Sequence, residues 1–475
     1  MQPEHLIFGG GTTDTILHPI VAVWMLIAAV LILVLPRNKA IVPFLLAFFM
    51  IPLGQIVVVG GIHFPVLRIL IIVGLVRIAL PQGSSRESSF AGGFNPLDQA
   101  VVLWTLSSLV VISLQWMELQ PFVKFVGDFL DSLGGYLVAR FLIPDRDAVW
   151  RTARVLAVIC LIQGAFMVSE QFTHRNVLDF LGATEPSLRE GHVRSEGVMG
   201  TLYGGVFAGV LIPLFLWLWT DGRFRVAALL GIVGSTTMVW ASHASTSWMA
   251  YGAGLFGLSF WLLRRRMRII RWGIVAALVG LHLVMHGPVW SLIEKIDVTG
   301  GSSNYHRYML VDNCIRHFGD WWLLGYKQYG DWGWDMWDLC NQFVAVALTG
   351  GLVSLVLYIL IFKRGFGAIG TARRQVEGNH KEEWFLWSLG AVLFAIVVSS
   401  FGINYMIQLQ IFMFSVLACV SVAAFAKHPQ SQTCAALDQM QSLSKLDKHG
   451  IHPSLGIGRK KGLGVSSSGK EEHFA

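Results

Sequence analysis

Long apolar runs recur along this chain of 475 residues, and most approach the about 20 residues that an α-helix needs to cross a bilayer. Because the backbone cannot hydrogen-bond to lipid, such a chain crosses a membrane as helices, which satisfy their own peptide groups. The sequence predicts an all-α polytopic membrane protein with about 12–13 transmembrane helices and a long periplasmic loop containing short helices. The predicted spans are residues 16–35, 41–60, 65–80, 97–116, 130–143, 155–169, 201–220, 226–241, 245–263, 272–285, 341–362, 385–402 and 407–426.

The residue composition favours a chain embedded in lipid. It is 54% hydrophobic and only 14% charged, whereas a soluble domain is about one-quarter charged. The net charge of +7 lies in short loops rather than on one soluble face, so the expected partner is the lipid bilayer and no nucleic acid. The sequence has no P-loop, dinucleotide fingerprint or zinc-type Cys/His spacing, and no cofactor is expected.

Basic residues orient the predicted helices, because Lys and Arg are enriched in cytoplasmic loops. They fall in alternate loops, at residues 37–39, 86, 146–154, 223–225, 264–271 and 363–381. This pattern places the N-terminus outside and the C-terminus in the cytoplasm, with long external loops at residues 171–200 and 286–340.

Residues 1–426 are the predicted membrane domain. Residues 427–475 are rich in Ser, Gly, Lys and Gln, which predicts a disordered cytoplasmic tail.

Arginines in both external loops are candidate anion-binding residues. Arg189 and Arg194 precede the helix that starts near residue 201, and Arg307 lies in the first turns of a predicted external helix. Guanidinium groups bind phosphate through paired, charge-assisted donors and stay charged at any working pH. A cation gains nothing from the dipole at a helix start, so an anionic ligand explains Arg307 better. The alternative for these arginines is contact with lipid headgroup phosphates.

Aromatic and acidic residues alternate near the end of the second external loop. Five tryptophans occur within residues 321–337, and Trp332, Trp334 and Trp337 are the candidate sugar-binding residues. Sugar rings stack on aromatic side chains, while carboxylates such as Asp335 and Asp338 accept hydroxyl groups and act as general bases. The alternative is an interfacial aromatic belt, in which Trp and Tyr are enriched without any ligand.

The same segment admits a divalent-metal site. Asp331, Asp335 and Asp338 would share one face if the segment were helical. Gly330 and Gly333 argue against a regular helix, so hydrogen bonding to substrate is favoured over metal binding.

Five cysteines occur, at positions 160, 314, 340, 419 and 434. On the predicted topology only Cys314 and Cys340 reach the oxidising side, where they can form one disulfide that braces the second external loop. The alternative is two unpaired, partly buried thiols, because sequence alone does not fix their separation.

Several features follow one another between residues 155 and 362. They are Arg194 to Gly197 before the helix that starts near Thr201, Ser245 to Ser247 at a helix start, Ser303 to Arg307, the turn from Leu323 to Gly330, and Asn341 followed by Gly351 and Leu352. In order and spacing they resemble the O-antigen ligase and O-antigen polymerase superfamily. Two departures stand out: the family's Arg is missing after Ser245, and Cys340 stands where the family's ligases have a His.

The resemblance implies a metal-independent glycosyltransferase of the bacterial inner membrane, which uses a polyprenyl-pyrophosphate-linked glycan as donor and needs no cofactor. On this interpretation Arg194 and Arg307, joined by Arg189, hold the pyrophosphate on the outer face. Asp338 or Asp335 takes the role of general base, and Asn341 orients the acceptor hydroxyl.

Cys340 favours polymerisation of repeat units of O-antigen or another surface polysaccharide over ligation of the glycan to a lipid or protein acceptor. A flippase and a chain-length regulator of the same pathway are the protein partners that this function implies. A rival interpretation is a lipid-linked sugar flippase or other transporter, which Arg68, Arg77 and Arg140 near helix ends would serve. A non-catalytic scaffold for polysaccharide export is the third.

Overall fold

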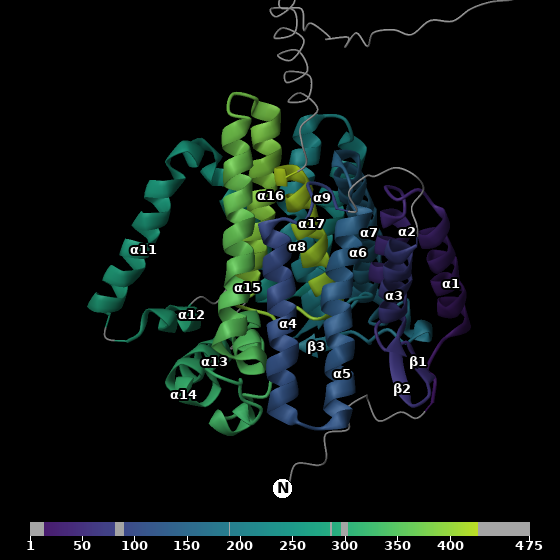
Figure 1. Ribbon diagram of the computed structural model, residues 1–475. Helices are drawn as coiled ribbons and strands as arrows, with labels where there is room; N and C mark the ends of the chain where they lie inside the picture. Colours follow the sequence, from purple (N-terminus) through teal and green to yellow (C-terminus); the bar gives the residue numbers. More distant parts are fainter. Residues whose placement is uncertain (1–13, 81–89, 190, 286, 296–302, 426–475) are drawn as a thin grey trace, which may run out of the picture. The chain divides into compact units, whose positions relative to one another are not determined.

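The computed structural model describes residues 14–80, 90–189, 191–285, 287–295 and 303–425. The predicted tail, 427–475, lies outside the described residues. Helices dominate the described part of the membrane domain (Figure 1), and short antiparallel hairpins occupy two of the connections. The chain is an all-α, multi-pass membrane protein, as the apolar runs predict.

The helices follow the predicted spans in order, and each predicted span overlaps at least one of them. A π-helical turn at Leu130–Gly134 joins α5 to α6, and 3-10 turns lie at Phe260–Arg266 between α10 and α11 and at Tyr329–Trp332. The helices are α1 (Pro19–Val34), α2 (Ile41–Met50), α3 (Val66–Ala79), α4 (Pro96–Trp116), α5 (Leu119–Phe129), α6 (Gly135–Leu142), α7 (Arg146–Thr173), α8 (Thr201–Asp221), α9 (Arg225–Ser242), α10 (Ser245–Ser259), α11 (Met267–Val284), α12 (Leu292–Lys295), α13 (Ser303–Arg316), α14 (Phe318–Trp321), α15 (Gln342–Gln375), α16 (His380–Ser399) and α17 (Ile407–Phe425).

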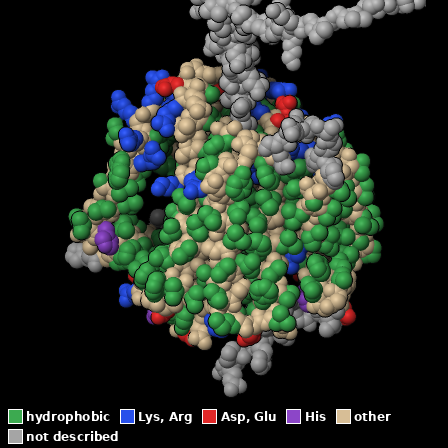
Figure 2. All heavy atoms as spheres, in the orientation of Figure 1, with side chains coloured by type: hydrophobic (Ala, Val, Ile, Leu, Met, Phe, Trp, Pro, Cys, Tyr) green, Lys and Arg blue, Asp and Glu red, His purple; other side chains and the backbone are tan. Residues whose placement is uncertain are grey.

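Eight helical segments among the described residues are long and apolar enough to cross a membrane, with α10 and α11 counted as one continuous segment, and α1 and α2 are shorter apolar helices. Fewer segments are long enough to cross than the 12–13 helices predicted from the sequence, and the predicted span 41–60 is one example. Its helix ends at Met50, and strand β1 (Ile56–Val59) follows, paired with β2 (Ile62–Pro65). In Figure 2, hydrophobic side chains cover the middle of the visible face while Lys and Arg gather at one end.

Helix α8 is the most enclosed of the long apolar helices, since α7, α9, α10 and α16 all pack against it. Its large side chains Phe207, Phe215 and Trp217 are fully buried. The N-terminal end of α8 follows the loop that leads from α7, so this packing holds that loop beside the end of α9 and the start of α10.

Helix α15 is interrupted at Gly351, where φ is 67° and ψ is −172°. The break exposes backbone groups that a neighbouring loop uses. Leu352 N donates to Trp322 O, and Tyr326 N donates to Leu348 O, each at 2.8 Å. The loop between α14 and α15 is therefore attached to α15 through its backbone, which fixes the position of the segment that follows these contacts.

Candidate functional site

The loop between α7 and α8 contains a hairpin of β3 (Ser187–Arg189) and β4 (His192–Arg194). Arg189 pairs with His192 in the register of this hairpin. The Gln171 side chain anchors it by donating to Val193 O at 2.8 Å and to Ala241 O at 3.0 Å. The hairpin is thus tied both to the end of α7 and to the end of α9.

A buried carboxylate fixes the link between β4 and α8. Glu170 accepts hydrogen bonds from the backbone N–H of Glu196, at 2.7 Å, and of Gly197, at 3.0 Å. The Glu196 carboxylate in turn accepts from Thr201 N at 2.8 Å. Because both ends of this link are held, Arg194 at the end of β4 has a defined position although it lies in a loop.

Arg307 lies in α13, so the predicted helix around it is confirmed. Its Nη1 donates to Asn304 Oδ1 at 2.6 Å and its Nη2 donates to Thr246 Oγ1 at 2.9 Å, whereas its buried Nε has no hydrogen-bond partner among the described residues. Burial lowers the pKa of Arg307, and the nearby charge of Arg189 lowers it further, while Cys340 and Asp338 act in the opposite direction. An arginine stays charged despite such a shift, so a positive charge is held here out of bulk water.

A second basic cluster adjoins β4. The imidazoles of His192 and His243 are stacked, with ring centroids 4.9 Å apart and planes within 8°. Burial lowers the pKa of His243, and the neighbouring His192 and Arg194 lower it further. The hairpin therefore carries Arg189 towards Arg307 and Arg194 towards His243, and together they form an anion-attracting surface.

Asp338 lies beside this surface and is exposed. Its carboxylate interacts electrostatically with Arg307 and with Tyr203 in the first turn of α8. An exposed carboxylate next to a partly buried guanidinium can accept a proton from a hydroxyl group while the guanidinium binds an anion. The structure thus brings together Arg189, Arg307 and Asp338, which the sequence grouped only by their order along the chain.

Cys340 and Cys314 are both free thiols, so the disulfide considered from the sequence is not formed. The Cys314 side chain packs in a small apolar cluster with Trp321, whereas Cys340 lies against Arg307. Burial raises the pKa of the Cys340 thiol to about 11, with Asp338 adding to the shift and Arg307 opposing it. The thiol is therefore protonated at neutral pH and is a poor nucleophile.

Asn341 has a structural role that the sequence analysis did not assign. It is the N-cap of α15, and its Oδ1 accepts hydrogen bonds from Phe343 N at 3.0 Å and Val344 N at 3.2 Å. Its Nδ2 donates to Phe401 O at 3.4 Å. With its acceptor and one donor engaged, Asn341 positions the start of α15.

The three candidate sugar-binding tryptophans differ in environment. Trp332 stacks on Tyr326, with centroids 5.4 Å apart, and on His317, with centroids 4.8 Å apart. Trp334 and Trp337 are 90% and 72% exposed. Trp334 and Trp337 therefore present faces that a sugar or the lipid interface can contact, whereas Trp332 braces the loop.

The acidic residues of this segment do not share a helical face. Asp331 lies in the short 3-10 turn at Tyr329–Trp332, and Asp335 has a left-handed backbone, with φ at 61°. The prediction from Gly330 and Gly333 that this segment is not a regular helix is thus confirmed. The alternative of one metal held by Asp331, Asp335 and Asp338 together loses its geometric basis.

Several residues of the site were not predicted from the sequence. Thr246 holds Arg307, His243 and His192 stack beside Arg194, and His306 precedes Arg307 in α13. Thr246 and His306 lay inside stretches already singled out, but nothing in the residue order assigned them a role. His243 caps the end of α9 in a left-handed conformation, which no local pattern indicated.

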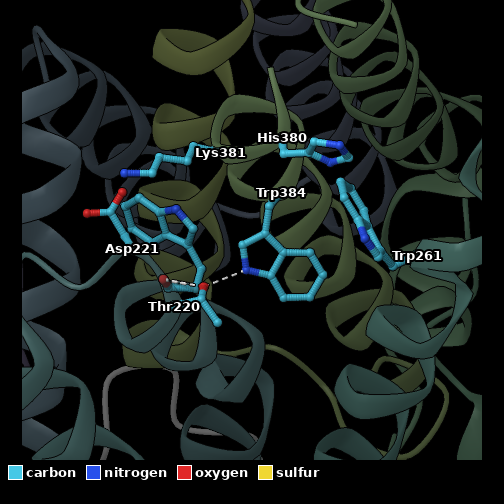
Figure 3. A pocket seen from close by; sticks show the side chains of 7 residues that line it. Thr220, Asp221, Trp261, His380, Lys381 and Trp384 are labelled. Atoms are coloured by element: carbon cyan, nitrogen blue, oxygen red, sulfur yellow. Dashed lines mark hydrogen bonds between the residues drawn. The ribbon is translucent and has the colours of Figure 1, made fainter. Parts of the chain in front are cut away.

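A cavity of about 370 Å³ lies far from this site, at the opposite end of α8 (Figure 3). Trp384 donates to Thr220 Oγ1 at 2.8 Å within it, and Asp221 and Lys381 lie together on one side. The rise of an α-helix places the two ends of α8 about 30 Å apart. This cavity therefore does not contribute to the basic surface around Arg307. Its lining residues are Trp217, Thr220, Asp221, Trp261, His380, Lys381 and Trp384.

Neither a family model nor a curated protein matches the chain. The site itself therefore supplies the grounds for a functional assignment.

Proposed function

We propose that this protein is a glycosyltransferase that acts on a polyprenyl-pyrophosphate-linked glycan at the outer face of the bacterial inner membrane. Its favoured reaction is the polymerisation of repeat units of O-antigen or another surface polysaccharide. The observation that carries the proposal is the convergence of Arg307 and Arg189, from two separate loops, beside the exposed carboxylate of Asp338.

The chemistry divides between these groups. The acceptor sugar hydroxyl attacks the anomeric carbon of the donor, a new glycosidic C–O bond forms, and the bond from that carbon to the pyrophosphate oxygen breaks. The Asp338 carboxylate accepts the hydroxyl proton, and the leaving pyrophosphate keeps the electron pair. Arg307, Arg189 and Arg194 stabilise the charge that develops on the leaving group, which lowers the barrier because the interaction strengthens as the bond breaks. Attack opposite the leaving group inverts the anomeric carbon.

The arrangement of the helices supports an outer-face location for the site. Strand β3, α13 and α14 lie at one end of the membrane domain, whereas Lys and Arg gather at the other end (Figures 1 and 2). Under the positive-inside rule the basic end is cytoplasmic. Polyprenyl-linked glycan delivered by a flippase would meet the site on the far side, where a chain-length regulator could also act.

The contacts of the arginines near helix ends weaken the transporter alternative. Arg140 forms a buried ion pair with Asp98, at 2.9 Å, and Arg68 forms a partly buried one with Asp131, at 2.7 Å. Arg77 donates to the backbone carbonyl of Ile32. These contacts occupy the arginines within the bundle, whereas substrate sites of transporters use charged groups left open near the bilayer midplane.

Ligation of the glycan to a lipid or protein acceptor remains the second candidate. It would use the same donor site and differ in the acceptor. Cys340 argues for polymerisation, since its protonated thiol cannot replace the His of the family's ligases as a base.

Complementation of a gene deletion tests the proposal. The wild type, Arg194→Ala, Arg307→Ala and Asp338→Asn would be produced at matched membrane levels, and surface polysaccharide would be resolved on a gel. Arg316→Ala is the matched control, because Arg316 lies on α13 too but its side chain is 70% exposed and pairs with Asp312.

Each outcome has a distinct meaning. Conversion of long chains to single lipid-linked units in the Arg307 variant, with long chains kept in the Arg316 variant, is the expected result. A polymer that persists on its polyprenyl carrier would instead identify ligation. Unchanged polysaccharide in every variant would overturn the transferase assignment and leave transport or an export scaffold.

A further inference from the structure

Three side chains with metal-binding atoms converge beside Arg307. His306 comes from α13, and Asp338 and Cys340 come from the segment just before α15. One ligand atom from each residue lies within 4.8 Å of the other two. His306 precedes Asp338 and Cys340 by more than 30 positions in sequence. The fold thus places an imidazole, a carboxylate and a thiol around one point.

A hydrogen bond fixes the tautomer of His306 and leaves one ring nitrogen available as a ligand atom. Its Nε2 lies 2.9 Å from the backbone oxygen of Asp338, and a carbonyl oxygen can only accept, so Nε2 carries the hydrogen. The other nitrogen, Nδ1, then carries a lone pair. Nδ1 is buried and has no hydrogen-bond partner among the described residues. Metal-bound histidines commonly donate their second ring N–H to a backbone carbonyl in this way, which fixes both the tautomer and the ring orientation.

The donor set matches Zn²⁺ among the common ions. Zn²⁺ binds imidazole nitrogen, thiolate sulfur and carboxylate oxygen at about 2.0–2.3 Å in a tetrahedral arrangement, whereas Mg²⁺ and Ca²⁺ prefer oxygen alone. Donors of one such ion lie about 3–4 Å apart, so the present arrangement must contract slightly. The exposed Asp338 side chain is free to make that adjustment.

Charge balance is also satisfied. Binding displaces the proton of the Cys340 thiol to solvent and forms a sulfur–metal bond. The thiolate and the Asp338 carboxylate then supply two negative charges for the two positive charges of the ion. The Arg307 guanidinium stays beside the thiolate, where it weakens binding relative to a site without a neighbouring cation but can donate a hydrogen bond to the sulfur.

We propose that His306, Asp338 and Cys340 bind one Zn²⁺ ion, with water completing the coordination. Binding itself is independent of the proposed function. One consequence rests on that function: an ion that holds the Asp338 carboxylate withdraws the general base, so zinc inhibits glycan transfer.

Direct metal binding tests the site. The purified full-length chain in detergent, with its affinity tag removed, would be treated with a chelator and titrated with ZnCl₂, and bound zinc would be measured by mass spectrometry of the metal. Co²⁺ would replace Zn²⁺ in a parallel titration, because a cobalt–thiolate bond gives a charge-transfer absorption band. The variants are His306→Ala and Cys340→Ser, and the control is Cys314→Ser, whose thiol is buried in a separate apolar cluster.

The expected result is one high-affinity ion per wild-type chain, with at least a tenfold weaker affinity in both site variants and no change in the Cys314 variant. The cobalt–thiolate band should disappear only in Cys340→Ser. Wild-type affinity in Cys340→Ser, or a wild-type chain that binds no zinc, would overturn the proposal. Thermal unfolding of each apo variant shows whether it is folded. Because the binding assay contains no glycan, a chain that binds zinc but whose metal-free form transfers no glycan in a separate assay would refute only the proposed function.

Discussion

Thr246 Oγ1 accepts a hydrogen bond from Arg307 Nη2 at 2.9 Å, which joins the first turn of α10 to α13. The same hydroxyl donates to Gly402 O at 3.3 Å, so it forms a relay between the guanidinium and the α16–α17 connection. Thr246 is buried. Among the contacts of the described residues, its hydroxyl is the only side-chain group that bonds to both Arg307 and Gly402. The position of Arg307 therefore depends on a hydroxyl group of a different helix.

Thr246→Val should reduce transfer while leaving the chain folded. Valine keeps the shape of threonine but removes the hydroxyl, and a hydrogen bond to a charged group contributes about 1.5–3 kcal/mol. We expect the rate constant of transfer to fall about tenfold or more, with a smaller effect on the apparent KM for the donor, because in the proposed reaction Arg307 acts mainly on the leaving group. Thr246→Ser should restore most of the rate. Equal rates for the Val variant and the wild type would refute the positioning role.

Asn341 offers a test that separates helix capping from chemistry. Loss of an N-cap acceptor costs about 0.5–2 kcal/mol, and serine is as good a cap as asparagine. Asn341→Ala should therefore lower the melting temperature, whereas Asn341→Ser should keep both the melting temperature and the transfer rate. If the Ser variant is folded but inactive, the amide has a role beyond the cap. Tryptophan fluorescence during heating and the polysaccharide gel supply the two readouts.

Residue order predicted the helices of this protein better than the arrangement of its site. The apolar runs located helices because burial in lipid requires continuous hydrophobic segments, so each predicted span overlaps one. The site, in contrast, depends on contacts between distant residues, such as Arg307 with Thr246 across 61 positions. The Asn341 cap was accessible to sequence reasoning, since Asn before an apolar run is a common helix start.

Gly351 should be among the least replaceable residues of α15. Its φ of 67° is costly for a residue with a side chain, by about 1–2 kcal/mol. An added Cβ would also lie 2.7 Å from Leu323 O, in the loop that docks on the break. Gly351→Ala should therefore destabilise the chain and lower transfer. Gly367→Ala is the control on the same helix, because a Cβ there meets nothing within 4 Å. A similar melting temperature for both variants would contradict the docking role of the break.

His243 should make the protein sensitive to acid. Burial, with His192 and Arg194 nearby, lowers its pKa in the folded state from the ordinary value of 6.5. Below about pH 6.5 the unfolded chain therefore binds a proton more readily than the folded chain does, so the free energy of unfolding falls as the pH drops towards the lowered pKa. Well above pH 6.5 the His243 imidazole is neutral in both the folded and the unfolded chain, so it adds no pH dependence to the free energy of unfolding there.

His243→Asn tests this dependence, because asparagine tolerates the left-handed backbone at the end of α9, where φ is 42°. Melting temperatures measured from pH 7.5 to about pH 5 should fall less steeply in this variant than in the wild type. His317→Asn controls for loss of a histidine at the surface, where the imidazole lies beside Asp320. Parallel curves for the wild type and His243→Asn would show that the stacked pair of His192 and His243 does not couple folding to pH, and the acid sensitivity would then lie elsewhere in the chain.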